Sequence, residues 1–180
     1  MKAMFYIALS LATVFLVNPV QSSVQRFAVF VGSNRGLYNE PALKYADRDA
    51  RQMAEVIGNS GTFNKDGIYL LPNPSLGEVR SVLDEVRDRV KQVAKSGNES
   101  VVLLYMSGHG EGGAVHIAGQ RLSLEEIRDY LSSLQSGLKI LVVDACESGD
   151  LLRQKGGKVL ETHHIEAEGK LEAHGTVVLS

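Results

Sequence analysis

The sequence predicts an α/β fold with a parallel sheet, and two observations support this prediction. Residues 100–106 and 138–143 are nearly continuous in valine, leucine and isoleucine, as is typical of strands buried on both faces. Segments with a helical period alternate with these strand-like runs along the chain. Strand, helix, strand, helix is the order in which a parallel sheet is built.

The predicted elements follow one another in that order. Strands are expected at 26–31, 68–71, 100–106, 138–143 and 176–179. Apolar residues three and four positions apart, from Leu43 to Ile57, indicate a first helix. Gly58 and Gly61 follow this stripe and are typical of a helix end.

Two capping boxes mark the starts of two further helices. Ser75 with Glu78 precedes a long apolar stripe that extends to Val93, and Ser123 with Glu126 precedes a shorter one. In a capping box the serine side chain accepts a hydrogen bond from the glutamate N–H, and the glutamate side chain accepts one from the serine N–H. We expect both halves of this exchange at each of the two helix starts.

Composition limits the class of protein. The chain has 180 residues, of which 44% are hydrophobic and 22% are charged, so it suits one globular domain with a buried core. There are 19 basic and 21 acidic residues, and no basic run stands out. Nucleic acid is therefore not expected as a partner, because its recognition needs a concentrated positive charge.

The first 22 residues have the pattern of a secretory signal peptide. A short positive start leads into an apolar run at 5–17, and compact residues precede a predicted cut after Ser22. We therefore expect an exported protein, periplasmic or secreted. The apolar run is short for a membrane span, so stable membrane association is not expected; an uncleaved anchor is the alternative.

Two short motifs place a histidine and the only cysteine directly after predicted strands. Ser-Gly-His-Gly stands at 107–110, and Asp-Ala-Cys-Glu-Ser-Gly stands at 144–149. Reactive groups gather where the chain leaves the carboxyl ends of parallel strands, so His109 and Cys146 are expected to meet. A thiol needs a neighbouring base to become a good nucleophile, and His109 can supply it.

The glycines around His109 fit acyl-transfer chemistry. They let the backbone approach a ligand closely, so the N–H groups of Gly110 and Cys146 are expected to face one developing oxyanion. A lone cysteine forms no internal disulfide, and we interpret Cys146 as a reactive group. The alternative is a structural cysteine buried in the core.

These motifs resemble the Ser-Gly-His-Gly and Asp-x-Cys-x-Ser-Gly contexts of the caspase-like cysteine peptidases. The resemblance covers residues 26–180 and implies one peptidase domain. It also implies a caspase-like three-layer α/β/α sandwich with a mostly parallel sheet. Family members normally continue beyond the last strand of this chain, so the C-terminal part of the domain is expected to be missing.

Within that family the metacaspases and bacterial caspase-family proteins are the better comparison. His109 and Cys146 are 37 positions apart, fewer than the roughly 50 of the caspases themselves. Caspases carry Gln-Ala-Cys at the nucleophile, whereas Asp144 and Glu147 flank the corresponding segment here.

The resemblance also implies a preference for cleavage after arginine or lysine. Metacaspase-like enzymes place an aspartate two residues before the cysteine, where Asp144 stands, and a second acid where Asp49 stands. Caspases proper hold an arginine where this chain has Leu43. For Asp47 and Asp49 the alternative is a role in capping, or in the first turn of the helix.

The chemistry implied by the dyad needs no metal or other cofactor, and a calcium requirement is left open. A protein or peptide is the expected substrate, and the sequence does not fix the oligomeric state. The second hypothesis is a non-catalytic binding or scaffold protein with the same fold, or an inactive fragment.

Three further patterns have alternatives of their own. Residues 108–113 fit the dinucleotide fingerprint G-x-G-x-x-G, but an apolar stretch follows where that fingerprint needs a helix. Between 150 and 175 the chain is predicted to be a loop, whose basic residues are either self-cleavage points or a solvated surface. For His163, His164 and Glu166 a surface loop is favoured over a metal site, because consecutive side chains point apart in an extended chain.

Overall fold

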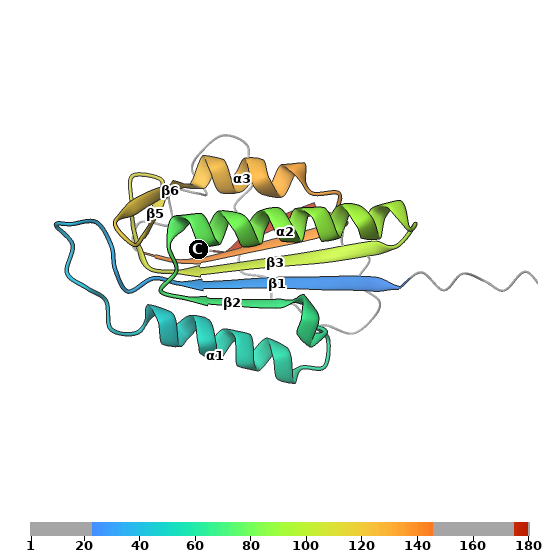
Figure 1. Cartoon of the computed structure of the whole chain (residues 1–180), viewed down its shortest axis with the longest axis horizontal. Coiled ribbons are helices and arrows are strands. Elements are labelled where there is room, and N and C mark those ends of the chain that lie inside the picture. The colour runs from blue at the N-terminus through green and yellow to red at the C-terminus, as the bar shows by residue number, and fades with distance from the viewer. Residues whose placement is uncertain (1–22, 146–174, 180) are drawn as a thin grey trace, which may run out of the picture.

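The computed structural model describes residues 23–145 and 175–179, and the statements below concern these residues. Their centre is a five-stranded parallel sheet with the strand order β2-β1-β3-β7-β8 (Figure 1). The strands are β1 (Val24–Gly32), β2 (Ile68–Pro72), β3 (Glu99–Ser107), β7 (Leu138–Asp144) and β8 (Gly175–Leu179). The predicted parallel sheet is therefore confirmed.

Helices cover both faces of this sheet. Helix α1 (Ala46–Asn59) lies on one face, and α2 (Leu76–Lys95) and α3 (Leu124–Ser133) lie on the other (Figure 1). A short 3₁₀ helix, η1 (Lys65–Gly67), leads into β2. These layers confirm the predicted three-layer α/β/α sandwich.

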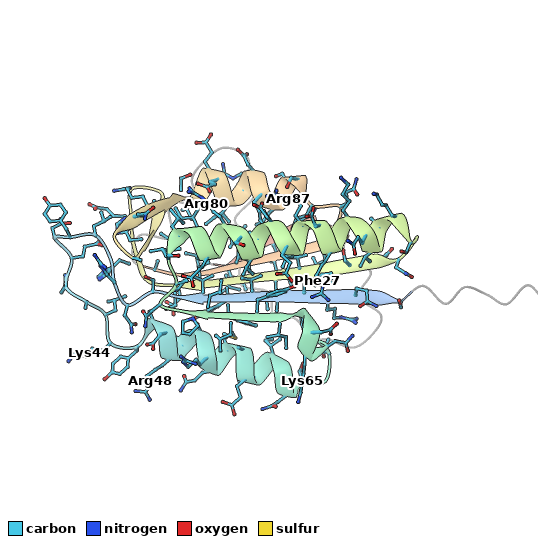
Figure 2. All side chains as sticks on the ribbon, viewed as in Figure 1. Phe27, Lys44, Arg48, Lys65, Arg80 and Arg87 are labelled. Carbon is cyan, nitrogen blue, oxygen red and sulfur yellow. The ribbon has the colours of Figure 1, made fainter. Side chains whose placement is uncertain are left out.

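Successive residues of β1 point to opposite faces, as the pleat of a strand requires. Phe27, Val29 and Val31 belong to the larger apolar cluster beneath α2 and α3, whereas Ala28 and Phe30 belong to the smaller cluster beneath α1. Figure 2 shows Phe27 in the layer between the sheet and α2. Each large side chain buried in this way stabilises the fold by about 1.5–3 kcal/mol.

A second, antiparallel sheet follows β3 and consists of β4 (His109–Glu111), β5 (Ala114–Ile117) and β6 (Gln120–Ser123). Gly112 and Gly113 form the two-residue turn between β4 and β5, with φ angles of 54° and 72°. Positive φ at both central positions is typical of a type I′ hairpin turn and favours glycine. The G-x-G-x-x-G pattern thus lies in a hairpin and not at a helix start, which argues against dinucleotide binding.

The two predicted capping boxes have different outcomes. At the start of α2, Ser75 and Glu78 exchange both hydrogen bonds. At the start of α3, Ser123 accepts the Glu126 N–H at 3.0 Å, but the Glu126 carboxylate contacts Arg80 of α2 at 2.8 and 3.0 Å. The prediction of a second complete capping box is therefore wrong for the bond from the Ser123 N–H to the glutamate. The Glu126 carboxylate pairs with Arg80 because a bidentate guanidinium is a stronger partner for a carboxylate than a backbone N–H.

Helix α1 begins later than its apolar stripe predicts. The Leu43 N–H donates to the Asn34 carbonyl at 2.7 Å, which keeps this part of the chain in the loop before the helix. Tyr45 occupies the N-cap position, and within residues 23–145 its side chain makes no capping bond. The helix therefore begins at Ala46.

Within residues 23–145 and 175–179, no helix is long and apolar enough to cross a membrane. The predicted signal peptide, residues 1–22, lies outside the described residues. So do Cys146, Glu147 and the predicted loop that follows them.

Candidate active site

Three neighbouring strands bring the predicted motifs to one edge of the sheet. Ser107 of β3 lies opposite Gly32 of β1 on one side and Asp144 of β7 on the other. The Gly108 N–H donates to the Asp144 carbonyl at 3.2 Å, so the chain leaves β3 directly beside the end of β7. Cys146 follows two residues later, outside the described residues, and its meeting with His109 stays a prediction.

His109 is held by a backbone carbonyl. Its side chain is half-buried at the first position of β4, and Nε2 lies 2.7 Å from the Pro41 carbonyl oxygen. A carbonyl only accepts hydrogen bonds, so Nε2 carries the proton in this contact. In the neutral ring Nδ1 is then the nitrogen with a free lone pair, which is the one a general base needs.

The loop 33–45 lies tightly against the His109 ring. A Cβ built on Gly36 would overlap Glu40 Oε2 and would lie 2.6 Å from His109 Cδ2. Any larger residue at this position would force Glu40 or the His109 ring to shift. The loop, the glutamate and the imidazole are therefore packed as one unit.

A second histidine lies beside the first. His116 of β5 is directly opposite His109 in the β4–β5 register, so both side chains are on the same face of the hairpin. The His116 side chain is fully buried, and its Nδ1 lies 2.8 Å from both carboxylate oxygens of Glu40. The sequence alone did not predict this pair, although a histidine within the apolar run of residues 114–118 was a sign that a buried partner was needed.

The environment of Glu40 favours the ionised carboxylate. Burial favours the neutral acid, but hydrogen bonds from the Leu37 N–H and His116, together with the charges of His116 and His109, outweigh it and lower the pKa of Glu40. Glu40 is therefore a negative charge close to both histidines.

The hairpin geometry directs the Gly110 N–H outward. Glu111 and Ala114 flank the two-residue turn, and such a flanking pair is hydrogen-bonded. Pairs alternate along an antiparallel ladder, so Gly110, opposite Val115, is a non-hydrogen-bonded pair whose N–H points away from β5. This direction suits an oxyanion donor. The second predicted donor, the Cys146 N–H, lies outside the described residues.

One of the two acids predicted to bind substrate contacts a buried phenol. Asp144 is exposed at the end of β7, and the Tyr105 hydroxyl donates to its Oδ2 at 3.4 Å. Burial raises the pKa of Tyr105, and the charges of Asp144 and Asp49 raise it further. Sequence reasoning missed Tyr105, although a tyrosine in a buried strand needs a partner for its hydroxyl.

Asp47 and Asp49 have different surroundings in the first turn of α1. The Asp47 carboxylate accepts a hydrogen bond from Asn34 Nδ2 at 2.7 Å, and the Asp47 N–H donates to Asn34 Oδ1 at 3.2 Å. This exchange ties the loop after β1 to the helix, so Asp47 has a structural role. Neither aspartate is the N-cap residue, which is Tyr45.

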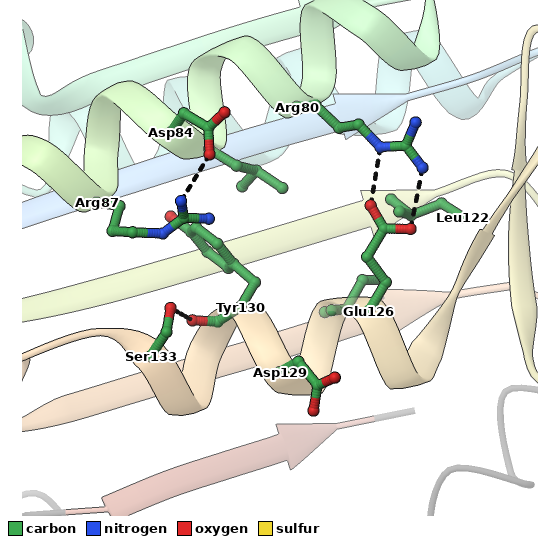
Figure 3. Close-up of a pocket in the computed structure, with 10 residues that line it drawn as sticks. Arg80, Asp84, Arg87, Leu122, Glu126, Asp129, Tyr130 and Ser133 are labelled. Atoms are coloured by element: carbon green, nitrogen blue, oxygen red, sulfur yellow. Dashed lines mark hydrogen bonds and ion pairs between the residues drawn. The ribbon is translucent and has the colours of Figure 1, made fainter.

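A groove of about 490 Å³ lies elsewhere, between α2 and α3. Figure 3 shows that its two arginines are already paired, Arg80 with Glu126 and Arg87 with Asp84, the latter at 2.8 Å. None of the predicted site residues lines this groove. We place the candidate site at the sheet edge, because Gly108, next to His109, lies there beside Asp144 at the end of β7.

No group of three or more His, Cys, Asp or Glu side chains is arranged to hold a metal ion in the part of the chain that the structure describes. His163, His164 and Glu166 lie outside it.

A comparison with known protein families matches the caspase domain, peptidase C14, over residues 25–177. The match includes nearly all of the sheet, both histidine-bearing strands and the predicted nucleophile. Domains of this type are typically cysteine peptidases, whose substrates are proteins. A search of curated proteins found no significant match.

Proposed function

We propose that this chain, which belongs to the caspase family, is a cysteine endopeptidase with Cys146 as the nucleophile and His109 as the general base. The observation that carries the proposal is the contact between His109 Nε2 and the Pro41 carbonyl. Because Nε2 is the donor in this contact, Nδ1 of the neutral ring keeps its lone pair, and β7 leads toward Cys146 at the same edge of the sheet.

The proposed reaction follows from these positions. His109 Nδ1 takes the proton of the Cys146 thiol, and the sulfur forms a bond to the scissile carbonyl carbon. The N–H groups of Gly110 and Cys146 donate to the resulting oxyanion. The imidazolium then gives its proton to the leaving amine as the peptide bond breaks. Water, deprotonated by His109, releases the acyl group from sulfur and restores the thiol.

We further propose that the enzyme is of the metacaspase type and cleaves after arginine or lysine. The support is the position of Asp144 at the end of β7, two residues before Cys146 in the sequence, with Asp49 in the first turn of α1 as the second predicted acid. A carboxylate suits a guanidinium, which donates several hydrogen bonds in a planar fork. Export through a signal peptide at residues 1–22 is part of the same proposal and rests on the sequence pattern alone.

Cleavage of a matched peptide panel tests the function. The purified chain is incubated with fluorogenic peptides that differ only in Arg, Lys, Asp or Gln before the scissile bond, with and without prior treatment by iodoacetamide. We expect cleavage after Arg and Lys, and its loss after alkylation. Preferred cleavage after Asp would contradict the basic pocket, and cleavage of no peptide would favour the binding or scaffold alternative.

A further inference from the structure

The loop 33–45 is fastened at its two ends by bonds that do not involve the histidines. At the first end, the Ser33 N–H donates to the Ser107 carbonyl at 2.9 Å. At the second end, the Leu43 N–H donates to the Asn34 carbonyl, and Asn34 is bonded to Asp47. The middle of the loop contacts the hairpin through two adjacent residues: Glu40 bonds to His116 and Pro41 bonds to His109.

These two contacts differ in kind. Pro41 offers a single neutral carbonyl to a half-buried ring, whereas Glu40 offers two carboxylate oxygens to a ring with no exposed surface. Charge-assisted hydrogen bonds are about twice as strong as neutral ones, and a low dielectric strengthens them further. The contact between Glu40 and His116 is therefore the stronger of the two. Pro41 is the next residue in the chain, so this contact also positions the Pro41 carbonyl.

From this geometry we propose that Glu40 and His116 form a positioning pair that holds the Pro41 carbonyl against His109 and so fixes the orientation of that ring. The inference rests on the proposed dyad and deepens it. His116 is buried, and among the described residues its ring bonds to Glu40, so it acts through Glu40 and the loop. Gly36 completes the arrangement, because it lets Glu40 and the His109 ring approach each other closely.

The experiment uses Glu40, because a replacement of the fully buried His116 risks unfolding the hairpin. Glu40→Ala removes the anchor, and Glu40→Gln keeps its shape but not its charge. Glu55→Ala, on the exposed side of α1, is the matched control for the loss of a glutamate. His109→Ala gives the alkylation rate and the kcat expected without a base. Circular dichroism checks that each variant is folded.

Two measurements separate this inference from the proposed function. The NMR shifts of the His109 ring report its surroundings and need no turnover. The rate at which iodoacetamide alkylates Cys146 reports how well the base serves the thiol and needs no peptide substrate. The values of kcat and KM on an arginine peptide complete the set, since poor positioning lowers kcat and leaves substrate binding intact.

In Glu40→Ala we expect shifted His109 ring signals, with both the alkylation rate and kcat lowered about tenfold or more, as is typical when a group that supports a reactive residue is lost. KM should stay within about twofold of the wild-type value. Glu40→Gln should fall between wild type and Glu40→Ala, and Glu55→Ala should behave as wild type.

Unchanged His109 ring signals in Glu40→Ala would overturn the positioning pair, whatever the activity. A wild-type alkylation rate in Glu40→Ala, while His109→Ala is slow, would overturn it as well. If the ring signals shift but His109→Ala alkylates as fast as wild type, the dyad of the proposed function is wrong, and the positioning pair is still supported.

Discussion

The carboxyl edge of the sheet and the face beneath α2 and α3 are built from the same strands in opposite ways. On the face, side chains such as Val29, Leu104 and Val86 are fully buried among other apolar groups. At the edge, polar groups are held by single directional bonds, such as that between His109 and Pro41. Burial on the face adds many small, non-directional contributions to the free energy of folding, whereas the hydrogen bonds at the edge fix the positions of polar groups. Changes in the two regions should therefore separate stability from activity.

The largest effect on activity is expected at the edge. His109→Ala or Cys146→Ala should lower kcat/KM on an arginine peptide by at least about a thousandfold, because each removes one member of a single nucleophile and base unit. Kinetics and thermal melting followed by circular dichroism measure the two quantities in parallel. Near wild-type cleavage by either variant, with an intact spectrum, would show that the dyad is wrongly assigned.

The largest effect on stability is expected on the face. Leu104 has no exposed surface, and Leu104→Ala should lower the free energy of unfolding by about 2–5 kcal/mol, through lost burial and the cavity left behind. Leu70→Ala on β2 is the control, because that side chain is 36% exposed. Urea denaturation measures both values. Equal losses in the two variants would contradict the claim that burial on this face provides the stability.

An intermediate effect is expected at Asp144. Loss of one partner of a desolvated carboxylate and guanidinium pair costs about 2–5 kcal/mol, so Asp144→Asn should lower kcat/KM on an arginine peptide about thirtyfold or more. The effect on a glutamine peptide should be far smaller. Stability should change little, because Asp144 is exposed. Equal losses on charged and neutral peptides would rule out the basic pocket.

The smallest effects are expected from replacing two glycines by alanine. Gly36→Ala should reduce kcat about tenfold, because its Cβ forces Glu40 or the His109 ring out of place. Gly58→Ala should raise the free energy of unfolding by about 0.5–1 kcal/mol, because Gly58 is in α1 and the nearest described atom to its Cβ would be Ile68 Cδ1 at 3.6 Å. A fully active Gly36→Ala would show that the loop and ring are not tightly packed.

The sequence predicted those parts of the fold that depend on local pattern. The apolar runs of β3 and β7, and the box at Ser75, each carry their own signature within a few residues. Only one of the two hydrogen bonds of the box at Ser123 forms, because the Glu126 carboxylate pairs with Arg80 on another helix.

In the candidate site, even less could be predicted from local sequence patterns. The ends of β3 and β7 were predictable, because parallel strands end at one edge of a sheet. The bond between Glu40 and His116 joins residues far apart in the sequence and depends on where a loop returns to a hairpin. No periodicity or motif encodes such a return. The place of Tyr105 beside Asp144 was missed for the same reason.

The strand order also sets when the site is assembled during synthesis. Val24 of β1 pairs with Glu99 of β3, so β1 cannot pair with β3 until the intervening segment is translated. This takes roughly ten seconds at typical rates. Parallel pairings over such separations also form slowly after synthesis. The ends of β1, β3 and β7 meet only when all three strands are in register. A nascent chain therefore carries the Ser-Gly-His-Gly motif before the strand ends that position it have come together.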